Sequence, residues 1–149
     1  MYDKILIPTD GSPTSELAIT HGLELARAMS SNVTFLHVLE NPLTTGYATP
    51  ATLPYSAQFY QDLKASAAAV LEQAENKARS LGVSASSTLI ENRDPAQAIA
   101  DASEDHDLVV MGTHGRSGFN RWMFGSVAEG ALRRANKPFL LIRDEGEEG

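Results

Sequence analysis

The sequence predicts one α/β domain built on a single open, mainly parallel sheet of five strands with helices on both faces. Three observations predict this fold class. Short apolar runs alternate along the chain with longer segments of helical periodicity, which is the pattern of a parallel sheet joined by helices. The 149 residues are the usual length of one domain and suffice to bury a hydrophobic core. The chain has no cysteine, so disulfides and thiolate chemistry are excluded.

The five strands are predicted from five apolar runs, and their composition predicts their order. In chain order the runs are 5–7, 33–39, 89–90, 108–111 and 139–142. The first and fourth are apolar throughout, as expected of central strands that are covered on both faces. The third lies in a mixed stretch, 84–91, which is typical of an edge strand. These differences predict the strand order 3-2-1-4-5.

Polar residues mark where the predicted helices begin. Ser12 and Asp94 each precede a proline, and both side chains can accept hydrogen bonds from the first backbone N–H groups of a helix. Ser126 stands three residues before Glu129, which is the spacing of a capping box. We therefore expect helices to begin at these three positions.

The second predicted helix is the longest, and the segment before it has no regular pattern. Apolar residues recur at spacings of three and four over 56–81, and Gly82 is the expected helix stop. The preceding segment, 41–55, is rich in proline and shows neither strand nor helix periodicity. A connection of this length is either a functional flap or a disordered segment.

The last strand predicts a partner. Phe139–Ile142 is as apolar as the central strands, yet the order 3-2-1-4-5 places it at a sheet edge. Unpaired backbone groups and apolar side chains would face water there. We therefore expect a homodimer built on this strand.

The balance of charge limits the other partners. The formal net charge is −7, which argues against general binding to nucleic acid or anionic membranes, because both require a basic face. Four acidic residues lie in 144–149, which we expect to be a flexible, solvated tail. No apolar run is long enough to span a membrane. The N-terminus leads directly into a strand and not into a signal peptide, so we expect a cytoplasmic protein.

The most informative stretch follows the fourth strand. Gly112, Gly115, Gly118 and Gly125 lie between this strand and the helix that starts at Ser126. Glycines let backbone N–H groups approach a polyphosphate closely, and a helix N-terminus adds donors and a partial positive charge. The spacing matches neither the P-loop nor the dinucleotide fingerprint. The loop therefore predicts a phosphate site of another type, with a plain glycine-rich connection as the alternative.

The four histidines do not predict a metal site. Their spacing is not that of metal ligands, and no cluster of carboxylates accompanies them. His21, His37 and His106 are interpreted as packing or surface residues, whereas His114 lies within the glycine loop. A divalent ion, Mg²⁺ or Mn²⁺, would be held largely by phosphate oxygens and water.

Two motifs resemble those of the universal stress protein family. The spacing Gly112-x2-Gly115-x9-Gly125-Ser126 is similar to the nucleotide-binding signature of the ATP-binding branch of this UspA-like family. The opening strand and turn, 5–12, are similar to the first strand and turn of the family, and the order of elements matches almost throughout. The resemblance implies a domain over 1–143 with a tail over 144–149. It also implies a Rossmann-like fold, similar to that of the adenine-nucleotide alpha hydrolases.

The resemblance further implies which residues bind the nucleotide. Those of the adenosine half are Pro8, Thr9, Asp10 and Val38. Those around the ribose and phosphates are Gly112, His114, Gly115, Arg116, Gly125, Ser126 and Val127, and the site is completed by Met111, Thr113, Ser117, Gly118 and Ala128. The predicted strand order agrees, because ligands bind beyond the carboxyl ends of the strands where the chain reverses direction. The plainer alternatives are a turn role for Asp10 and a capping role for Ser126.

Binding is favoured over catalysis. Hydrolysis needs a group that positions water and a cation that stabilises the developing charge, and the residue pattern does not assemble that set. We expect an ATP-binding protein that acts as a nucleotide-dependent sensor or regulator in the stress response. A slow ATPase that uses the same site and a nucleotide-free dimeric interaction module are the alternatives.

Overall fold

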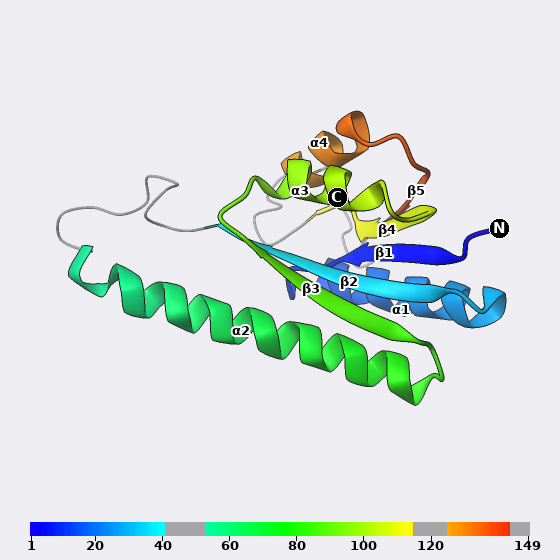
Figure 1. Ribbon diagram of the computed structural model, residues 1–149, viewed down its shortest axis with the longest axis horizontal. Helices are drawn as coiled ribbons and strands as arrows, with labels where there is room; N and C mark the ends of the chain where they lie inside the picture. Colours follow the sequence, from blue (N-terminus) through cyan, green and yellow to red (C-terminus); the bar gives the residue numbers. More distant parts are fainter. Residues whose placement is uncertain (41–52, 115–124, 144–149) are drawn as a thin grey trace.

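The computed structural model describes residues 1–40, 53–114 and 125–143. Strands and helices alternate in the order β1 (Lys4–Pro8), α1 (Pro13–Met29), β2 (Asn32–Leu39), α2 (Leu53–Ser80), β3 (Ala85–Glu91), α3 (Pro95–Ser103), β4 (Leu108–Gly112), α4 (Ser126–Arg134) and β5 (Phe139–Ile142). The strands form one parallel sheet of order β3-β2-β1-β4-β5 (Figure 1). The predicted fold class and strand order are therefore confirmed.

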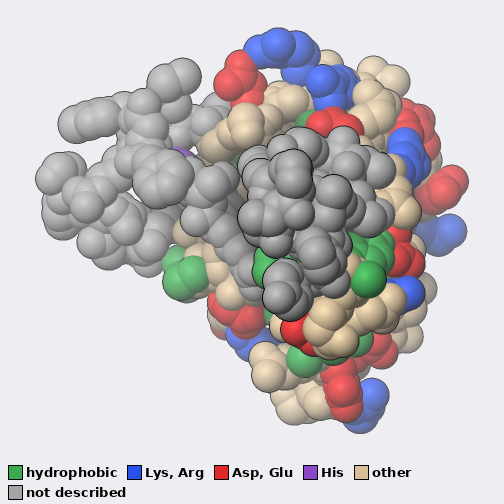
Figure 2. Space-filling view, turned by 90° about the vertical axis from the view of Figure 1, so that its left-hand side faces the viewer, with side chains coloured by type: hydrophobic (Ala, Val, Ile, Leu, Met, Phe, Trp, Pro, Cys, Tyr) green, Lys and Arg blue, Asp and Glu red, His purple; other side chains and the backbone are tan. Residues whose placement is uncertain are grey.

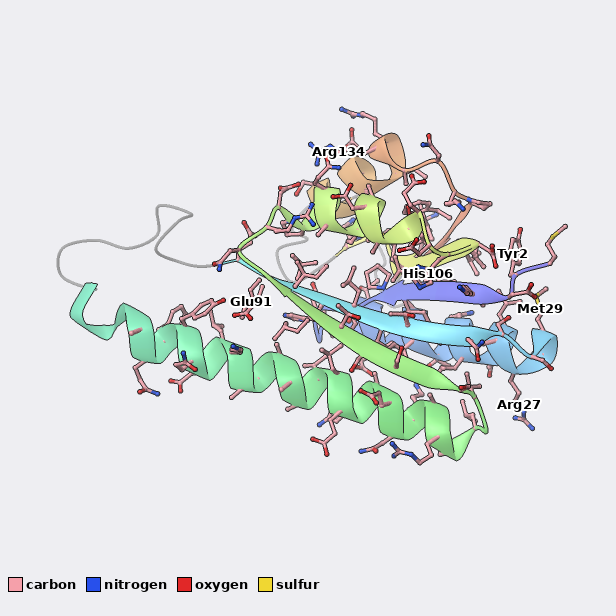
Figure 3. The ribbon with its side chains drawn as sticks, in the orientation of Figure 1. Tyr2, Arg27, Met29, Glu91, His106 and Arg134 are labelled. Atoms are coloured by element: carbon pink, nitrogen blue, oxygen red, sulfur yellow. The ribbon has the colours of Figure 1, made fainter. Side chains whose placement is uncertain are left out.

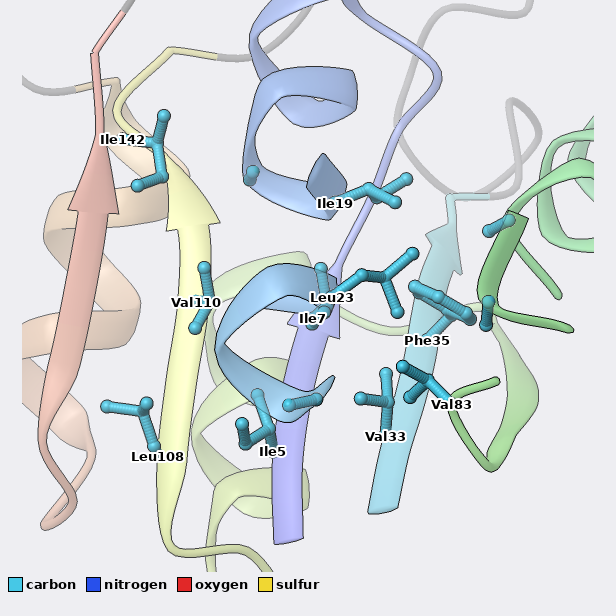
Figure 4. Packing of buried hydrophobic residues seen from close by; sticks show 14 of the residues in the cluster. Ile5, Ile7, Ile19, Leu23, Val33, Phe35, Val83, Leu108, Val110 and Ile142 are labelled. Carbon is cyan, nitrogen blue, oxygen red and sulfur yellow. The ribbon is translucent and has the colours of Figure 1, made fainter. Parts of the chain in front are cut away.

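The helices cover both faces of the sheet, and each face has its own core. Ile5 and Ile7 of β1 point toward α1 and α2, where they pack with Phe35 and Leu23 in the larger cluster (Figure 4). Leu6, between them, points to the opposite face and packs in a second cluster with residues of α3 and α4. All three β1 side chains are fully buried, as predicted for a central strand.

All three predicted helix starts are confirmed, but one of the three predicted caps is wrong. The Ser12 side chain accepts a hydrogen bond from the backbone N–H of Ser15, and Asp94 caps α3 in the same way. The capping box at Ser126 is absent, because the cap of α4 is Gly125, whose extended backbone has φ −61° and ψ 152°. Ser126 is already the first helical residue, so it has no capping geometry.

The long helix α2 begins earlier than the apolar periodicity indicated. It starts at Leu53, so part of the predicted irregular segment is helical. Proline is tolerated in a first turn, because the first N–H groups of a helix have no acceptor within the helix. Gly82 ends the helix as predicted, with a left-handed φ of 73°. Residues 41–52 of the segment and the acidic tail lie outside the described residues.

The two edge strands of the sheet, β3 and β5, differ in the burial of their side chains. β3 has no fully buried side chain, which fits the mixed composition of an edge strand. β5 forms the other edge, and its Leu140 side chain is 40% exposed. Among the described residues, no helix combines the length and the apolar character needed to cross a membrane.

Candidate functional site

The turn between β1 and α1 is fixed by short polar side chains. The Thr9 hydroxyl donates to the Ser15 hydroxyl at 3.1 Å, and Asp10 Oδ1 accepts from the backbone N–H of Ser12 at 2.9 Å. Gly11 completes the turn with a φ of 81°, a conformation that favours glycine. The turn role predicted as an alternative for Asp10 is therefore present, and it does not exclude a role in binding.

The chain leaves β4 and enters α4 at neighbouring points. The Thr113 backbone N–H donates to the carbonyl of Ile142 at 2.9 Å, and the Thr113 carbonyl accepts from the backbone N–H of Gly125 at 2.6 Å. The Thr113 hydroxyl lies 2.9 Å from Nδ1 of His114. The end of β4 and the start of α4 are therefore joined directly, so the N-terminus of α4 lies at the carboxyl end of the sheet.

The start of the glycine loop packs on the first turn of α1, directly after the turn at Asp10, through a close contact between Gly112 and Thr14. A Cβ atom on Gly112 would lie 2.6 Å from Cγ2 of Thr14 and 3.2 Å from its backbone oxygen. A side chain at position 112 would therefore strain the packing of α1 on β4, whatever the loop binds. The turn after β1 and the loop after β4 are far apart in the sequence, but they begin close together at the carboxyl end of the sheet.

The predicted site residues lie at three depths. Buried are Pro8, Thr9, Met111, Gly112, Thr113 and Ala128; half-buried are Asp10, Val38, His114 and Gly125; exposed are Ser126 and Val127. Gly115, Arg116, Ser117 and Gly118 fall outside the described residues. Met111 and Ala128 pack in the second core cluster, so they position their neighbours by burying their side chains. Among the described site residues, the side chains that reach the surface are those of Asp10, Val38, His114, Ser126 and Val127.

Basic side chains lie near the carboxyl ends of the strands, on the side of α4. Figure 2 views the carboxyl ends of the strands and shows Lys and Arg side chains at the top, where Figure 1 places α4. The last turn of α4 carries Arg133 and Arg134. Both are paired with carboxylates, Arg133 with Glu129 and Arg134 with Asp94. These two arginines therefore stabilise α4 and its contact with α3, as expected for cations near a helix C-terminus.

His37 is packed inside the protein, which is one of the two roles predicted for it. Its side chain is 7% exposed, and its Nδ1 atom lies 2.9 Å from the carbonyl oxygen of Thr9. A signal was present in the sequence: His37 occupies an inward position in an apolar strand, two residues after Phe35. A polar group at such a position needs a hydrogen-bond partner inside the protein.

A cluster at the end of β3 ties that edge to α2. Glu91 accepts a hydrogen bond from the hydroxyl of Tyr60 at 2.5 Å and lies 3.4 Å from Nζ of Lys64. Figure 3 shows Glu91 on the side of β3 that faces α2. The hydrogen bond with Glu91 raises the pKa of Tyr60 to about 12, and the same bond lowers the pKa of Glu91. The described residues contain no group of three His, Cys, Asp or Glu side chains that could hold a metal ion.

The fold and this arrangement define a class of protein. An open parallel sheet whose central strands end in a polar turn and a glycine loop, beside a helix N-terminus, is typical of α/β nucleotide-binding proteins. The model of the universal stress protein family matches residues 1–143, and the chain belongs to that family.

Individual relatives match over nearly the whole chain. Universal stress protein MJ0531 of Methanocaldococcus jannaschii is 30% identical over 150 residues, which cover 99% of this chain and 86% of that protein. The solved structure of MJ0577 from the same organism is 26% identical, has a TM-score of 0.82 and covers 99% of both chains. These two proteins therefore match this chain over the sheet, the four described helices and the two segments that flank the candidate site, the turn after β1 and the start of α4.

Two more distant structures contain adenine nucleotides. The universal stress protein from Archaeoglobus fulgidus in complex with dAMP is 23% identical, with a TM-score of 0.69, and covers 95% of this chain and 98% of that chain. A family member from Arabidopsis thaliana with AMP bound is 20% identical, with a TM-score of 0.66, and covers 98% of this chain and 95% of that chain. At these identities the likeness is one of fold, and the nucleotides belong to those two proteins.

Proposed function

We propose that this protein binds ATP at the carboxyl ends of β1 and β4 and acts as a nucleotide-dependent sensor or regulator in the stress response. The observation that carries the proposal is the contact between Thr14 and Gly112. It brings the turn that holds Asp10 next to the loop whose glycine spacing is similar to the ATP-binding signature. The dAMP and AMP in the two distant relatives support an adenine nucleotide as the ligand class.

The proposed roles follow from what each residue offers. The turn at Thr9 and Asp10, together with Val38, takes the adenosine half. Ser126 and Val127, at the N-terminus of α4, offer backbone N–H groups to the phosphates, because the first N–H groups of a helix have no acceptor within the helix. Gly125 as the helix cap suits this role, since no side chain competes for these groups. Mg²⁺ or Mn²⁺ would be held through the phosphates.

The first test identifies the nucleotide that the protein carries. Freshly purified protein is denatured without added ligand, and the released small molecules are identified by chromatography and mass spectrometry. We expect ATP in an amount approaching that of the protein, which indicates tight binding with little turnover. ADP from a protein that also releases phosphate linearly would favour an ATPase. No released nucleotide, followed by no binding in calorimetric titrations of ATP, ADP and AMP, would contradict the proposal.

A charge placed at the start of α4 tests the phosphate position. Val127→Glu puts a carboxylate on an exposed first-turn position, where the helix dipole favours it, so the fold should keep its stability. We expect the Kd for ATP to rise by about tenfold through repulsion of the phosphates, with a smaller rise for AMP. Ala69→Glu adds the same charge at an exposed position in the middle of α2 and is the control. Equal Kd values for both variants and wild type would contradict this position.

We also propose that the protein works in the cytoplasm as a homodimer paired along β5. Within the described part of the chain, the sheet order leaves one side of β5 without a neighbouring strand, and Leu140 of this strand is 40% exposed. Leu140→Lys is expected to give a monomer by light scattering at micromolar concentration. Phe59→Lys changes a side chain on α2 that is 54% exposed, and it should leave the dimer intact. A wild-type monomer, or a dimer that survives Leu140→Lys, would contradict the interface.

A further inference from the structure

His37 is a polar side chain at a core-facing position of β2. Val33 and Phe35 precede it on the same face of the strand and belong to the larger core cluster. His37 is 7% exposed, and its Nδ1 atom lies 2.9 Å from the carbonyl oxygen of Thr9. A carbonyl oxygen can only accept a hydrogen bond, so the proton of this contact must lie on Nδ1. The contact therefore fixes the tautomer of the ring as well as its orientation.

Thr9 is held by β2 on two sides. Its backbone N–H donates to the carbonyl of Leu36 at 2.8 Å, which continues the strand pairing between β1 and β2 by one residue. Its carbonyl accepts from His37, beyond the last paired residue of β1. Backbone pairing within the sheet thus orients the N–H of Thr9. The carbonyl of Thr9, and with it the peptide that leads to Asp10, is oriented by the side chain of His37.

The turn beyond Thr9 is built on this residue. The Thr9 hydroxyl donates to the Ser15 hydroxyl and lies 3.4 Å from the backbone N–H of Gly11. Asp10 Oδ1 then accepts from the N–H of Ser12 at 2.9 Å. A rotation of the Thr9–Asp10 peptide would move the Asp10 side chain and displace these bonds together. The hydrogen bond from His37 is the contact from β2 that opposes this rotation.

We infer that His37 is a positioning residue of the nucleotide site. Its Nδ1–H holds the Thr9 carbonyl, and this contact sets the turn that presents Asp10 to the ligand. The inference rests on the proposed function, because it assigns to a core residue control over the affinity of that same site. A histidine that only fills the core would affect the stability of the fold and would leave the affinity unchanged.

Three substitutions separate the hydrogen bond from the bulk of the ring. His37→Leu removes the donor. His37→Asn places a side-chain amide N–H close to the position of Nδ1, whereas His37→Gln places its amide closer to that of Nε2. We expect the Kd for ATP to rise by about tenfold in His37→Leu and His37→Gln, and to stay within about threefold of wild type in His37→Asn. Rescue by asparagine but not by glutamine is the result that core filling alone does not produce.

A second measurement needs no nucleotide. In the ligand-free protein, ¹⁵N spectra of the imidazole should show His37 protonated at Nδ1, and hydrogen exchange should report the order of the turn. We expect the Ser12 amide to exchange about tenfold faster in His37→Leu than in wild type. The Val110 amide, in the centre of β4, should exchange equally in both. His37→Asn should restore the protection of Ser12.

The outcomes separate this inference from the proposed function. If wild type binds ATP and all three variants bind it equally, the inference is wrong and the proposed function stands. If affinity falls in all three variants in step with their urea midpoints, His37 is a core residue and the inference is wrong. If wild type binds no adenine nucleotide, the proposed function fails and the inference fails with it. If His37→Leu does not fold, the comparison of His37→Asn with His37→Gln still shows whether a donor at the position of Nδ1 sets the affinity for ATP.

Discussion

The two ends of the sheet use polar groups in opposite ways. At the amino ends of the strands, Asp107 Oδ2 accepts from the backbone N–H groups of Asp3 at 3.0 Å and Lys4 at 2.9 Å. Ser31 donates to the carbonyl of Tyr2, which Figure 3 shows close to the N-terminal end of the chain. These bonds join segments far apart in the sequence, so polar groups at the amino ends of the strands stabilise contacts between distant parts of the chain.

At the carboxyl ends the polar side chains form short local turns. The side chains of Thr9, Asp10 and Ser12 bond to nearby residues of the same turn, whereas the backbone of Thr9 bonds to β2 and that of Thr113 to Ile142 and Gly125. The helices α1, α3 and α4 also begin at this end, so their N-terminal dipoles point toward it. The difference teaches that one sheet can use polar side chains for two tasks: those at its amino ends join distant segments, and those at its carboxyl ends shape turns beside helix N-termini, where an anion is favoured.

The largest effect is expected where the two motifs meet. Gly112→Ala puts a methyl group 2.6 Å from Cγ2 of Thr14, a stiff side chain, and 3.2 Å from its backbone oxygen. We expect the free energy of unfolding to fall by about 1–3 kcal/mol in urea titrations, as overpacking does elsewhere. Thr14→Ser removes this Cγ2 and should recover part of the loss in the double variant. Unchanged stability of Gly112→Ala would contradict the tight contact.

An intermediate effect is expected at the amino end. Asp107→Ala removes the acceptor of two backbone N–H groups, so it should lower the free energy of unfolding at pH 7 and leave the Kd for ATP unchanged. Asp107→Asn keeps one acceptor oxygen and should lose less stability. A large change in nucleotide affinity in either variant would contradict the claim that the amino ends of the strands take no part in nucleotide binding.

The same carboxylate gives this stabilisation a pH dependence. The backbone N–H of Lys4, followed by that of Asp3, lowers the pKa of Asp107 below its ordinary value of 3.8. Since the folded pKa is the lower one, the contribution is complete above about pH 4 and is lost as the pH falls through the folded pKa. The difference in unfolding free energy between wild type and Asp107→Ala should therefore shrink below about pH 4. A difference that stays constant down to the acid transition would contradict this assignment.

The smallest effect on stability is expected at the carboxyl end of β3. Glu91→Gln replaces the carboxylate that holds the Tyr60 hydroxyl, so the pKa of Tyr60 should fall from about 12 toward 10.0. The pKa is measured by NMR titration of the tyrosine rings, with Tyr60→Phe to assign the signal. Lys64→Met is the control, because it leaves the hydrogen bond in place. Stability should change little, since the group is at the surface.

The fold was predictable because its signals are local and repeated. Apolar β1 and β4 and mixed β3 gave the strand order, and the caps at Ser12 and Asp94 gave two helix starts. The absent capping box at Ser126 shows the limit of such signals. The same letters fit a cap or a first helical residue, and the backbone conformation of Gly125 decides between them.

The location of the nucleotide site stays a prediction from the sequence, and the contacts that support the candidate site could not be predicted. The glycine spacing and the strand order both indicated the carboxyl ends of β1 and β4. The roles of Thr14 and His37 depend on contacts between elements, which spacing along one chain does not encode. Gly112 is the clearest case, because its preference for glycine comes from Thr14, a residue of helix α1.

The most direct test of the account is a titration of ¹⁵N-labelled protein with ATP, followed by backbone amide spectra. We predict that the amide signals of Thr9, Asp10, His114, Ser126 and Val127 shift with one common Kd, while those of Asp3, Lys4 and Asp107 stay unchanged. Shifts confined to the amino ends of the strands, or no saturable shifts at the carboxyl ends, would contradict the claim that this end of the sheet binds the nucleotide.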